Sequence, residues 1–233
     1  MNGAYDLIIQ IYRYAGNFDT VIFALPVIIL TIMIYWLARL VWHKRKFGKD
    51  FKAIRRKARL NELIRLLAVC WFSALLCLTL TPTEFWMHLW MSAVGGGDTF
   101  ESFFPGRFGE IYLVPAILMY ISEGDSGLSL LTEIITDHQM MLNILLFVPL
   151  GAVMPFICGK ADFFRTVLAG FSLSMSIEFV QFFLGRSCET DDLICNTLGA
   201  AAGYLLFLLI KKLFPAFTEK GRLSAKSIYT AAG

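Results

Sequence analysis

Long apolar runs, separated by short polar or charged segments, make up most of the chain. A helix needs about 20 largely apolar residues, at roughly 1.5 Å of rise each, to cross about 30 Å of hydrocarbon. Five runs have about that length, at residues 20–42, 63–80, 140–158, 166–184 and 193–210. Each is bounded by charged residues or by glycine and proline. The pattern predicts an all-α fold, namely a polytopic integral membrane helical bundle of about five transmembrane helices.

Two further segments refine this prediction. The apolar segment 111–121 is interrupted by Pro115 and is too short to cross a membrane, so we interpret it as interfacial or re-entrant. The first run is long, and no cleavage motif of small residues follows it. We therefore expect this run to be a retained span and not a signal peptide.

The charges of the loops predict one orientation. The first connection carries a run of basic residues against Asp50 alone: Lys44, Arg45, Lys46, Lys49, Lys52, Arg55, Arg56, Lys57 and Arg59. Loops rich in Lys and Arg stay in the cytoplasm. Alternate crossings then place the acidic connection 82–138 outside and the basic tail 211–233 inside. We expect a multi-pass protein of the cytoplasmic membrane, with its N-terminus out and its C-terminus in.

The basic connection has two interpretations. Each Lys or Arg near an anionic membrane surface contributes about 1 kcal/mol of attraction, so the segment could make a regulated contact with lipid. Alternatively, it sets the topology and lies on the headgroups as a basic helix. No nucleic-acid-binding motif accompanies the charge, and we expect no nucleic-acid partner.

Composition agrees with a membrane protein. The chain is 57% hydrophobic and 17% charged, whereas soluble domains are about 45–50% apolar and about 25% charged. We divide it into an N-terminal two-span region with the basic loop (1–100), a membrane domain (101–210) and a cytoplasmic tail (211–233). The five cysteines form no CxxC pair and lie near no histidine cluster, so we expect no metal and no cofactor.

Polar side chains recur at one depth in the last three spans. Asn143, Glu178, Gln181 and Asn196 lie near the outer ends of their spans, and Asp192 lies four residues before Asn196. At 1.5 Å per residue they lie roughly 5–10 Å below the outer boundary. A charged side chain inside a span costs about 2.5–3.5 kcal/mol on insertion scales, so such residues indicate function.

Helical spacing also places these residues on shared faces. Ser174, Glu178 and Gln181 are separated by four and three residues and point the same way. In the last span Asp192 and Asn196 continue into Gly199 and Gly203, a GxxxG that allows another helix to approach closely.

Structural interpretations compete with a functional one. Asp191 or Asp192 could cap the last helix, and Asn143 and Asn196 could serve as interhelical hydrogen-bond partners. Glu178 lies within a helix, where capping does not apply, so it must be neutral, paired or in contact with a wet cavity. Its obvious partner is Arg186, which requires the chain to turn back at Gly185. The candidate ligand-binding residues are Asn143, Glu178, Gln181, Arg186, Asp192 and Asn196.

These residues carry a resemblance to a known family. Asn143 followed by Phe147-Val-Pro149-Leu-Gly151 resembles the VanZ pattern of Asn and then Phe-x-Pro-Phe-Gly, with Leu150 where Phe is usual. Glu178-Phe-Val-Gln181 resembles its E-x-x-Q element. The segment from Asp192 to Gly199 resembles its closing D-x-x-x-N-T-x-G.

The resemblance covers about residues 107–209 and implies an all-helical membrane fold and a link to resistance against glycopeptide antibiotics, notably teicoplanin. One element departs from the family. Where the family often has Asn-Leu-x-Pro-Phe, this chain reads Tyr112-Leu-Val-Pro115-Ala. The resemblance supplies no mechanism.

Three functions remain open. The first is a non-enzymatic protein that binds an amphiphile, either a lipoglycopeptide antibiotic or a lipid-linked envelope precursor, in an outer-leaflet polar pocket. The second is an intramembrane enzyme acting on such a lipid, with Glu178 or Asp192 as acid/base. The third is a lipid transporter, although no inverted repeat is evident. No Ser-His, Cys-His or HExxH arrangement and no glycine-rich phosphate loop is present, so we name no catalytic residue and prefer the binding function, with membrane lipids as further partners.

Overall fold

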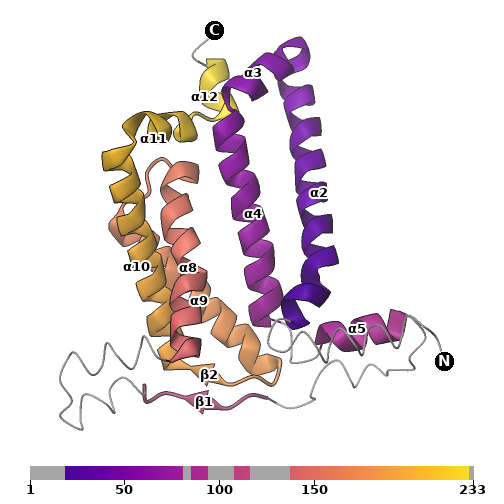
Figure 1. Ribbon diagram of the computed structural model, residues 1–233, viewed down its shortest axis with the longest axis vertical. Helices are drawn as coiled ribbons and strands as arrows, with labels where there is room; N and C mark the ends of the chain where they lie inside the picture. Colours follow the sequence, from indigo (N-terminus) through magenta and orange to yellow (C-terminus); the bar gives the residue numbers. More distant parts are fainter. Residues whose placement is uncertain (1–18, 81–84, 94–107, 116–136, 231–233) are drawn as a thin grey trace.

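Five long apolar helices form the body of the protein (Figure 1). The computed structural model describes residues 19–80, 85–93, 108–115 and 137–230. The long helices are α2 (Asp19–Phe47), α4 (Arg59–Leu80), α8 (His138–Ile157), α9 (Phe163–Phe183) and α10 (Thr190–Leu213). All five are long and apolar enough to cross a membrane. This confirms the prediction of an all-α, multi-pass membrane protein with five spans.

Polar ends lengthen the helices beyond the apolar runs. α2 continues through Lys44, Arg45 and Lys46, which are good helix formers and favour the negative end of the helix dipole. The start of α8 is fixed by Asp137, whose carboxylate accepts hydrogen bonds from the N–H groups of Gln139 and Met140. Hydropathy alone misses such turns because they contribute charge or caps and no apolar surface.

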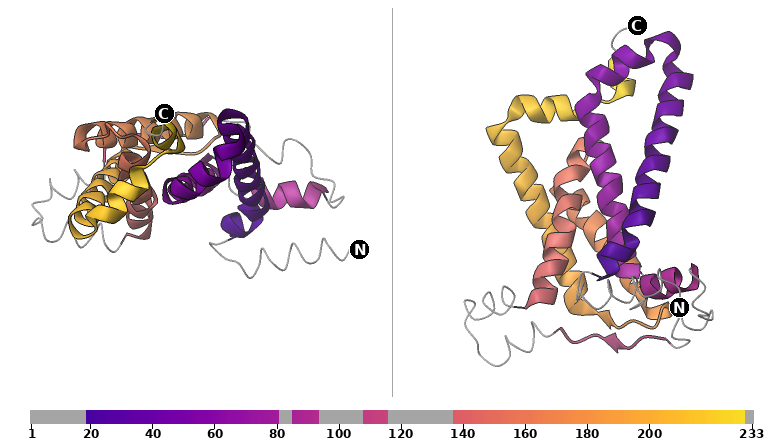
Figure 2. Two further views of the ribbon diagram at one scale, coloured as in Figure 1. Left: turned by 90° about the horizontal axis from the view of Figure 1, so that it is seen from above. Right: turned by 45° about the vertical axis from the view of Figure 1, so that its right-hand side comes forward.

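The helices form two groups, with α2 and α4 in one and α8, α9 and α10 in the other (Figure 2). Leu75 of α4, Phe147 of α8 and Ile177 of α9 are buried together in one apolar cluster. The indole N–H of Trp71 donates to the Leu146 carbonyl oxygen at 2.7 Å. α4 therefore joins the two groups.

Glycines bring α8 and α10 into backbone contact. A Cβ added at Gly199 would overlap the carbonyl oxygen of Ile144, and one added at Gly203 would overlap that of Val148. From the other side, a Cβ at Gly151 would overlap the carbonyl oxygen of Ala200. The prediction that the GxxxG admits a close neighbour is confirmed, and that neighbour is α8.

We call the end of the bundle near Gly48 and Gly221 the basic end. Here η2 (Gly48–Asp50) and α3 (Phe51–Lys57) connect α2 to α4, and α11 (Pro215–Arg222) and α12 (Ala225–Thr230) follow α10. The buried Asn61 amide of α4 donates to the Gly221 carbonyl oxygen at 2.7 Å. The Arg222 guanidinium donates to the Pro155 carbonyl oxygen at 3.2 Å. α11 thus ties α4 to α8.

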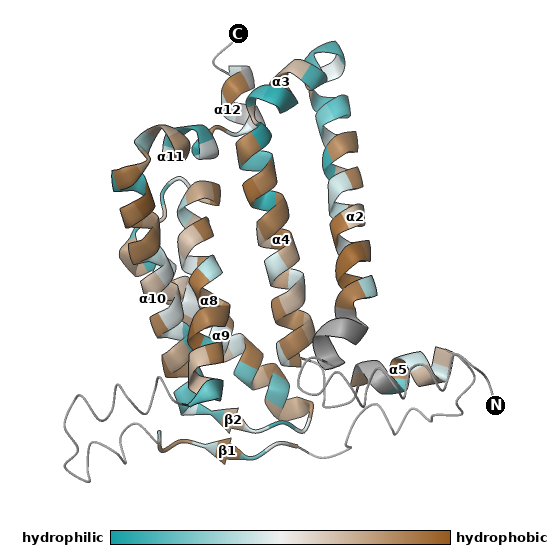
Figure 3. Cartoon of the chain, in the orientation of Figure 1, coloured by the Kyte–Doolittle hydropathy of each residue, from teal (hydrophilic) through white to brown (hydrophobic). Residues whose placement is uncertain are grey.

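We call the opposite end the strand end, because β1 (Ile111–Tyr112) and β2 (Cys188–Glu189) pair there in parallel. Figure 3 shows hydrophilic residues gathered at both ends and apolar residues along the helices between them. A short helix, α5 (Phe85–Ala93), also lies at the strand end, and it was not predicted from the pattern of apolar runs. Of the segment 111–121, the first two residues form β1, and residues 116–121 lie outside the described part of the chain.

The described chain begins and ends at opposite ends of the bundle, as five crossings require (Figure 1). Which end faces the cytoplasm stays a prediction from loop charge, with the strand end outside.

Candidate functional site

The buried carboxylate of Glu178 receives its hydrogen bonds from β2. The side chain is 5% exposed on α9. Its Oε2 atom accepts a hydrogen bond from the backbone N–H of Glu189 at 3.0 Å, and the Cys188 thiol donates a second one. The sequence pointed to Arg186 as the partner of this group. The backbone donor could not be predicted, because nothing in a sequence marks a particular N–H group as available.

Cys188 lies outside the spans, and the Glu178 carboxylate affects the pKa of its thiol. Burial raises the pKa of its thiol, and the negative charge of Glu178 and the hydrogen bond between the two side chains raise it further. The thiol therefore stays protonated and acts as a donor, not as an activated nucleophile. All five cysteines are free, so Cys188 and Cys195 form no disulfide.

Asn143 and Asp192 form the contact between α8 and α10 at this level. The Asn143 amide donates to the Asp192 carboxylate at 2.6 Å. Glu178, Glu189 and Arg186 are the charged groups that act most strongly on Asp192. Asp192 thus bonds an amide and is under the electrostatic influence of Glu178, a carboxylate on a different helix.

The interpretation that Asp191 or Asp192 caps α10 is wrong. Glu189 occupies the position that caps the helix, and its side chain makes no capping hydrogen bond. Asp191 and Asp192 are the second and third residues of the helix, within its first turn, so neither is the cap. Their charges still favour the positive end of the helix dipole.

The chain turns back at Gly185, as pairing of Arg186 with this region requires. Gly185 has a φ of 76°, a conformation that glycine adopts without strain. The N–H of Arg186 donates to the Gln181 carbonyl oxygen at 3.0 Å and that of Gly185 to the Phe182 carbonyl oxygen at 3.3 Å. This is the Schellman arrangement that ends many helices, and it turns Arg186 back towards the bundle.

Arg186 and Gln181 bind the last turn of α4. The Arg186 guanidinium donates to the carbonyl oxygens of Thr79 at 3.1 Å and Leu78 at 3.5 Å, and the Gln181 amide donates to Thr79 at 2.8 Å. The final four carbonyl groups of a helix have no partner within it. Two predicted ligand-binding residues therefore satisfy two of these carbonyl groups in α4, those of Leu78 and Thr79.

Asn196 points to α9 one turn deeper. Its amide nitrogen donates to the Ser174 hydroxyl at 2.9 Å, and both side chains are buried. Its Oδ1 atom is buried and makes no hydrogen bond within the described part of the chain. Ser174, Glu178 and Gln181 are all buried on one face of α9, as their spacing predicts.

Residues 108–112, which we call the strap, precede the third span and pack against the strand end of the bundle. Phe108 stacks on Phe182 with ring centres 5.5 Å apart, and the Gly109 N–H donates to the Phe182 carbonyl oxygen at 2.8 Å. The Cys188 N–H then donates to the Glu110 carbonyl oxygen at 2.8 Å. The strap thereby positions β2, whose N–H group binds Glu178.

The six predicted residues thus share one layer at the strand end but divide into bonded groups. Asn143 is hydrogen-bonded to Asp192, and Glu178 to β2. Asn196 is hydrogen-bonded to Ser174, and Gln181 and Arg186 to α4. Their convergence on a single cavity stays a prediction. Among the described residues, no group of three His, Cys, Asp or Glu side chains could hold a metal ion. The chemistry available is that of carboxylates, amides and one guanidinium.

Comparison with known proteins supports the resemblance seen in the motifs. The family model for VanZ/LLP1 matches residues 68–211, which is more than half of the chain. The match begins within α4 and extends into the last turn of α10, so it includes every residue of the layer. No curated protein and no solved structure matches the chain. The chain belongs to the VanZ/LLP1 family.

Proposed function

We propose that this VanZ-family protein binds the polar head of an amphiphile at the strand end, in the outer leaflet of the cytoplasmic membrane. The ligand class is a lipoglycopeptide antibiotic such as teicoplanin or a lipid-linked envelope precursor. In this proposal the protein contributes to glycopeptide resistance by binding and not by catalysis.

One observation carries the proposal. Two carboxylates from neighbouring helices, Glu178 and Asp192, lie in the same layer, where the charges of Glu178 and Arg186 both act on Asp192. Paired acidic groups in a membrane span are costly to desolvate, and folding alone would be served as well by apolar residues. Carboxylates, amides and a guanidinium together suit hydroxyl, amide and phosphate groups of a ligand head.

The buried Oδ1 atom of Asn196 adds support. Buried polar atoms in folded proteins nearly always have a hydrogen-bond partner. A hydroxyl or amide of a bound ligand would supply that partner beside Ser174.

Substitution of Glu178 tests the proposal. Glu178→Gln keeps the shape and an oxygen acceptor for the Glu189 N–H, so we expect the protein to remain monodisperse with a similar melting temperature. We expect it to lose teicoplanin tolerance in cells and to lose binding of a lipid-linked precursor in nanodiscs. Glu219→Gln, an exposed carboxylate on α11 at the far end, is the matched control and should behave as wild type.

The comparison applies once the wild-type protein is seen to confer tolerance or to bind the precursor. A stable Glu178→Gln protein with full tolerance and full binding would contradict the proposal and leave Glu178 with a structural role.

The same pair of carboxylates favours a second candidate, an intramembrane enzyme in which Glu178 or Asp192 exchanges a proton with a lipid-linked substrate. Binding and catalysis differ in stoichiometry. A binding protein retains an unchanged precursor, at most one for each site, whereas an enzyme converts many per molecule. Mass spectrometry of the precursor after prolonged incubation distinguishes the two.

A further inference from the structure

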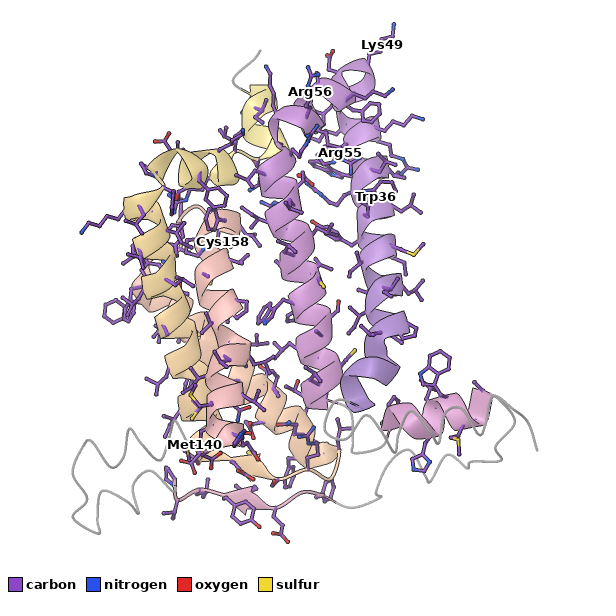
Figure 4. The ribbon with its side chains drawn as sticks, in the orientation of Figure 1. Trp36, Lys49, Arg55, Arg56, Met140 and Cys158 are labelled. Atoms are coloured by element: carbon purple, nitrogen blue, oxygen red, sulfur yellow. The ribbon has the colours of Figure 1, made fainter. Side chains whose placement is uncertain are left out.

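The basic end contains a cavity that the proposed function does not use. It lies where α2, α3 and α4 meet, has a volume of about 540 Å³, and is bounded by five basic side chains and one acidic one. They are Arg39, Lys52, Arg55, Arg56, Arg59 and Glu62. Figure 4 labels Arg55, Arg56 and Trp36 at this end of the bundle. We call this space the basic cavity.

The single acidic group does not neutralise the cavity. Glu62 is held by Arg39, whose guanidinium donates to both carboxylate oxygens at 2.6 and 3.1 Å. Among the described residues, no ion pair includes Lys52, Arg55, Arg56 or Arg59. Four positive charges therefore line the cavity with no acidic partner among the residues that the structure describes, and this arrangement suits phosphate groups.

The walls of the basic cavity are apolar on the membrane side. Leu40 of α2 and Leu63 and Leu66 of α4 line it together with Trp36. The Arg55 guanidinium lies 5.5 Å from the centre of the Trp36 ring, which is 48% exposed. Tryptophan at this level is typical of the headgroup region of a bilayer. A ligand that fills the cavity would thus meet charge at one side and hydrocarbon at the other.

A second cavity continues the basic surface. It has a volume of about 530 Å³, shares Arg56, Arg59 and Leu63 with the first, and adds Phe217 and Lys220 of α11. Arg56 and Arg59 therefore line both cavities and can contact a phosphate in either one.

We propose that the basic cavity binds the phosphate headgroup of an anionic phospholipid, with the acyl chains lying along Leu63 and Leu66. A basic segment that only sets the topology needs its charges near the membrane and does not need a cavity with an aromatic wall. Here α3 folds across the ends of α2 and α4 and gathers the charges. A water-soluble phosphate ester could make the same charge contacts, but the apolar wall favours the lipid.

Titration of the purified full-length protein in detergent tests this proposal, with bound lipid measured by native mass spectrometry. The probes are phosphatidylglycerol, phosphatidylcholine and water-soluble glycerol phosphate. The test variant is Arg56→Gln/Arg59→Gln. The matched control is Lys44→Gln/Lys49→Gln, which removes the same charge from the same connection at positions outside both cavities.

We expect phosphatidylglycerol to bind at least tenfold more tightly than either other probe. Each basic contact contributes about fivefold in affinity, so the test variant should bind it about 25-fold more weakly. The control should stay within about twofold of wild type. Arg56 and Arg59 are exposed and make no described hydrogen bond, so the test variant should fold normally. If it does not fold, Lys52→Gln/Arg55→Gln takes its place.

Three results would overturn the proposal. Equal loss in test and control variants would show a diffuse charge effect. Equal binding of phosphatidylcholine would remove the role of the negative charge, and equal binding of glycerol phosphate would identify a soluble ligand.

Discussion

The Asn143 amide and the Asp192 carboxylate meet across the contact between α8 and α10 at 2.6 Å, 49 residues apart in the chain. A hydrogen bond to a charged acceptor is stronger than a neutral one. Interhelical hydrogen bonds in membranes nevertheless average only about 0.6 kcal/mol, with a maximum of about 1.7 kcal/mol. This pair is therefore a local link between two helices that already touch through their glycines.

A double-mutant cycle measures that link. We expect Asn143→Ala and Asp192→Ala each to destabilise the protein, and the double variant to lose less than the sum of the two. The coupling free energy should be about 0.5–1.7 kcal/mol. Reversible unfolding of the purified protein in mixed micelles provides the four free energies. Strict additivity would mean that the two groups do not interact.

The glycine contact makes a steric prediction. Gly199→Ala places a methyl group against the Ile144 carbonyl oxygen and should force α8 and α10 apart. Overpacking typically costs about 1–3 kcal/mol, and each kcal/mol lowers the melting temperature by roughly 2–4 °C in a chain of this size. Gly159→Ala is the control, because no atom lies within 4 Å of the added Cβ. Equal melting temperatures for the two variants would argue against close packing of these helices.

Much of the fold could be predicted from the sequence because apolar length and helical spacing are local properties. The five spans and the buried face of Ser174, Glu178 and Gln181 follow from such patterns. α5 has nine residues and lies below any length criterion for a span. β1 and β2 have two residues each and lie far apart in the chain, so no periodicity marks them.

The sequence predicts the depth at which the candidate site residues lie, but it does not predict their hydrogen-bond partners. Depth along each helix places Asn143, Glu178 and Asn196 at one level. Their bonding depends on groups that carry no sequence signature, such as the Glu189 N–H and the Thr79 carbonyl. Backbone donors and acceptors are present at nearly every position, and only the tertiary structure selects among them.

Reactivity of Cys188 tests the hydrogen bond to Glu178. The carboxylate and burial raise the pKa of this thiol, so at neutral pH we expect slow alkylation by maleimide. Glu178→Gln removes the negative charge, which lowers the pKa of Cys188, increases the thiolate fraction at a given pH and speeds alkylation. The measurement is the pH profile of labelling in a background where the other four cysteines are alanine. An unchanged profile would place Glu178 too far from Cys188 to act on it.

Orientation follows from loop charge and can be tested directly. Reporter fusions after Lys49 and Lys220 should indicate the cytoplasm, and fusions near Gly97 and Ser187 should indicate the outside. Lys49 and Ser187 lie at opposite ends of the bundle, so their readings should differ whatever the orientation. A cytoplasmic reading at Ser187 would reverse the predicted topology and move the candidate site to the inner leaflet.

The hydrogen bonds from Gln181 and Arg186 to Thr79 also constrain how the protein is made. They join residues 102 and 107 positions apart. A ribosome adding about 5–20 residues per second reaches Gln181 about 5–20 s after it has passed Thr79. Throughout that interval the last carbonyl groups of α4 must be satisfied by interfacial water. The bundle can close at this end only when translation is nearly complete, so the order of synthesis makes the layer around Glu178 one of the last parts of the protein to form.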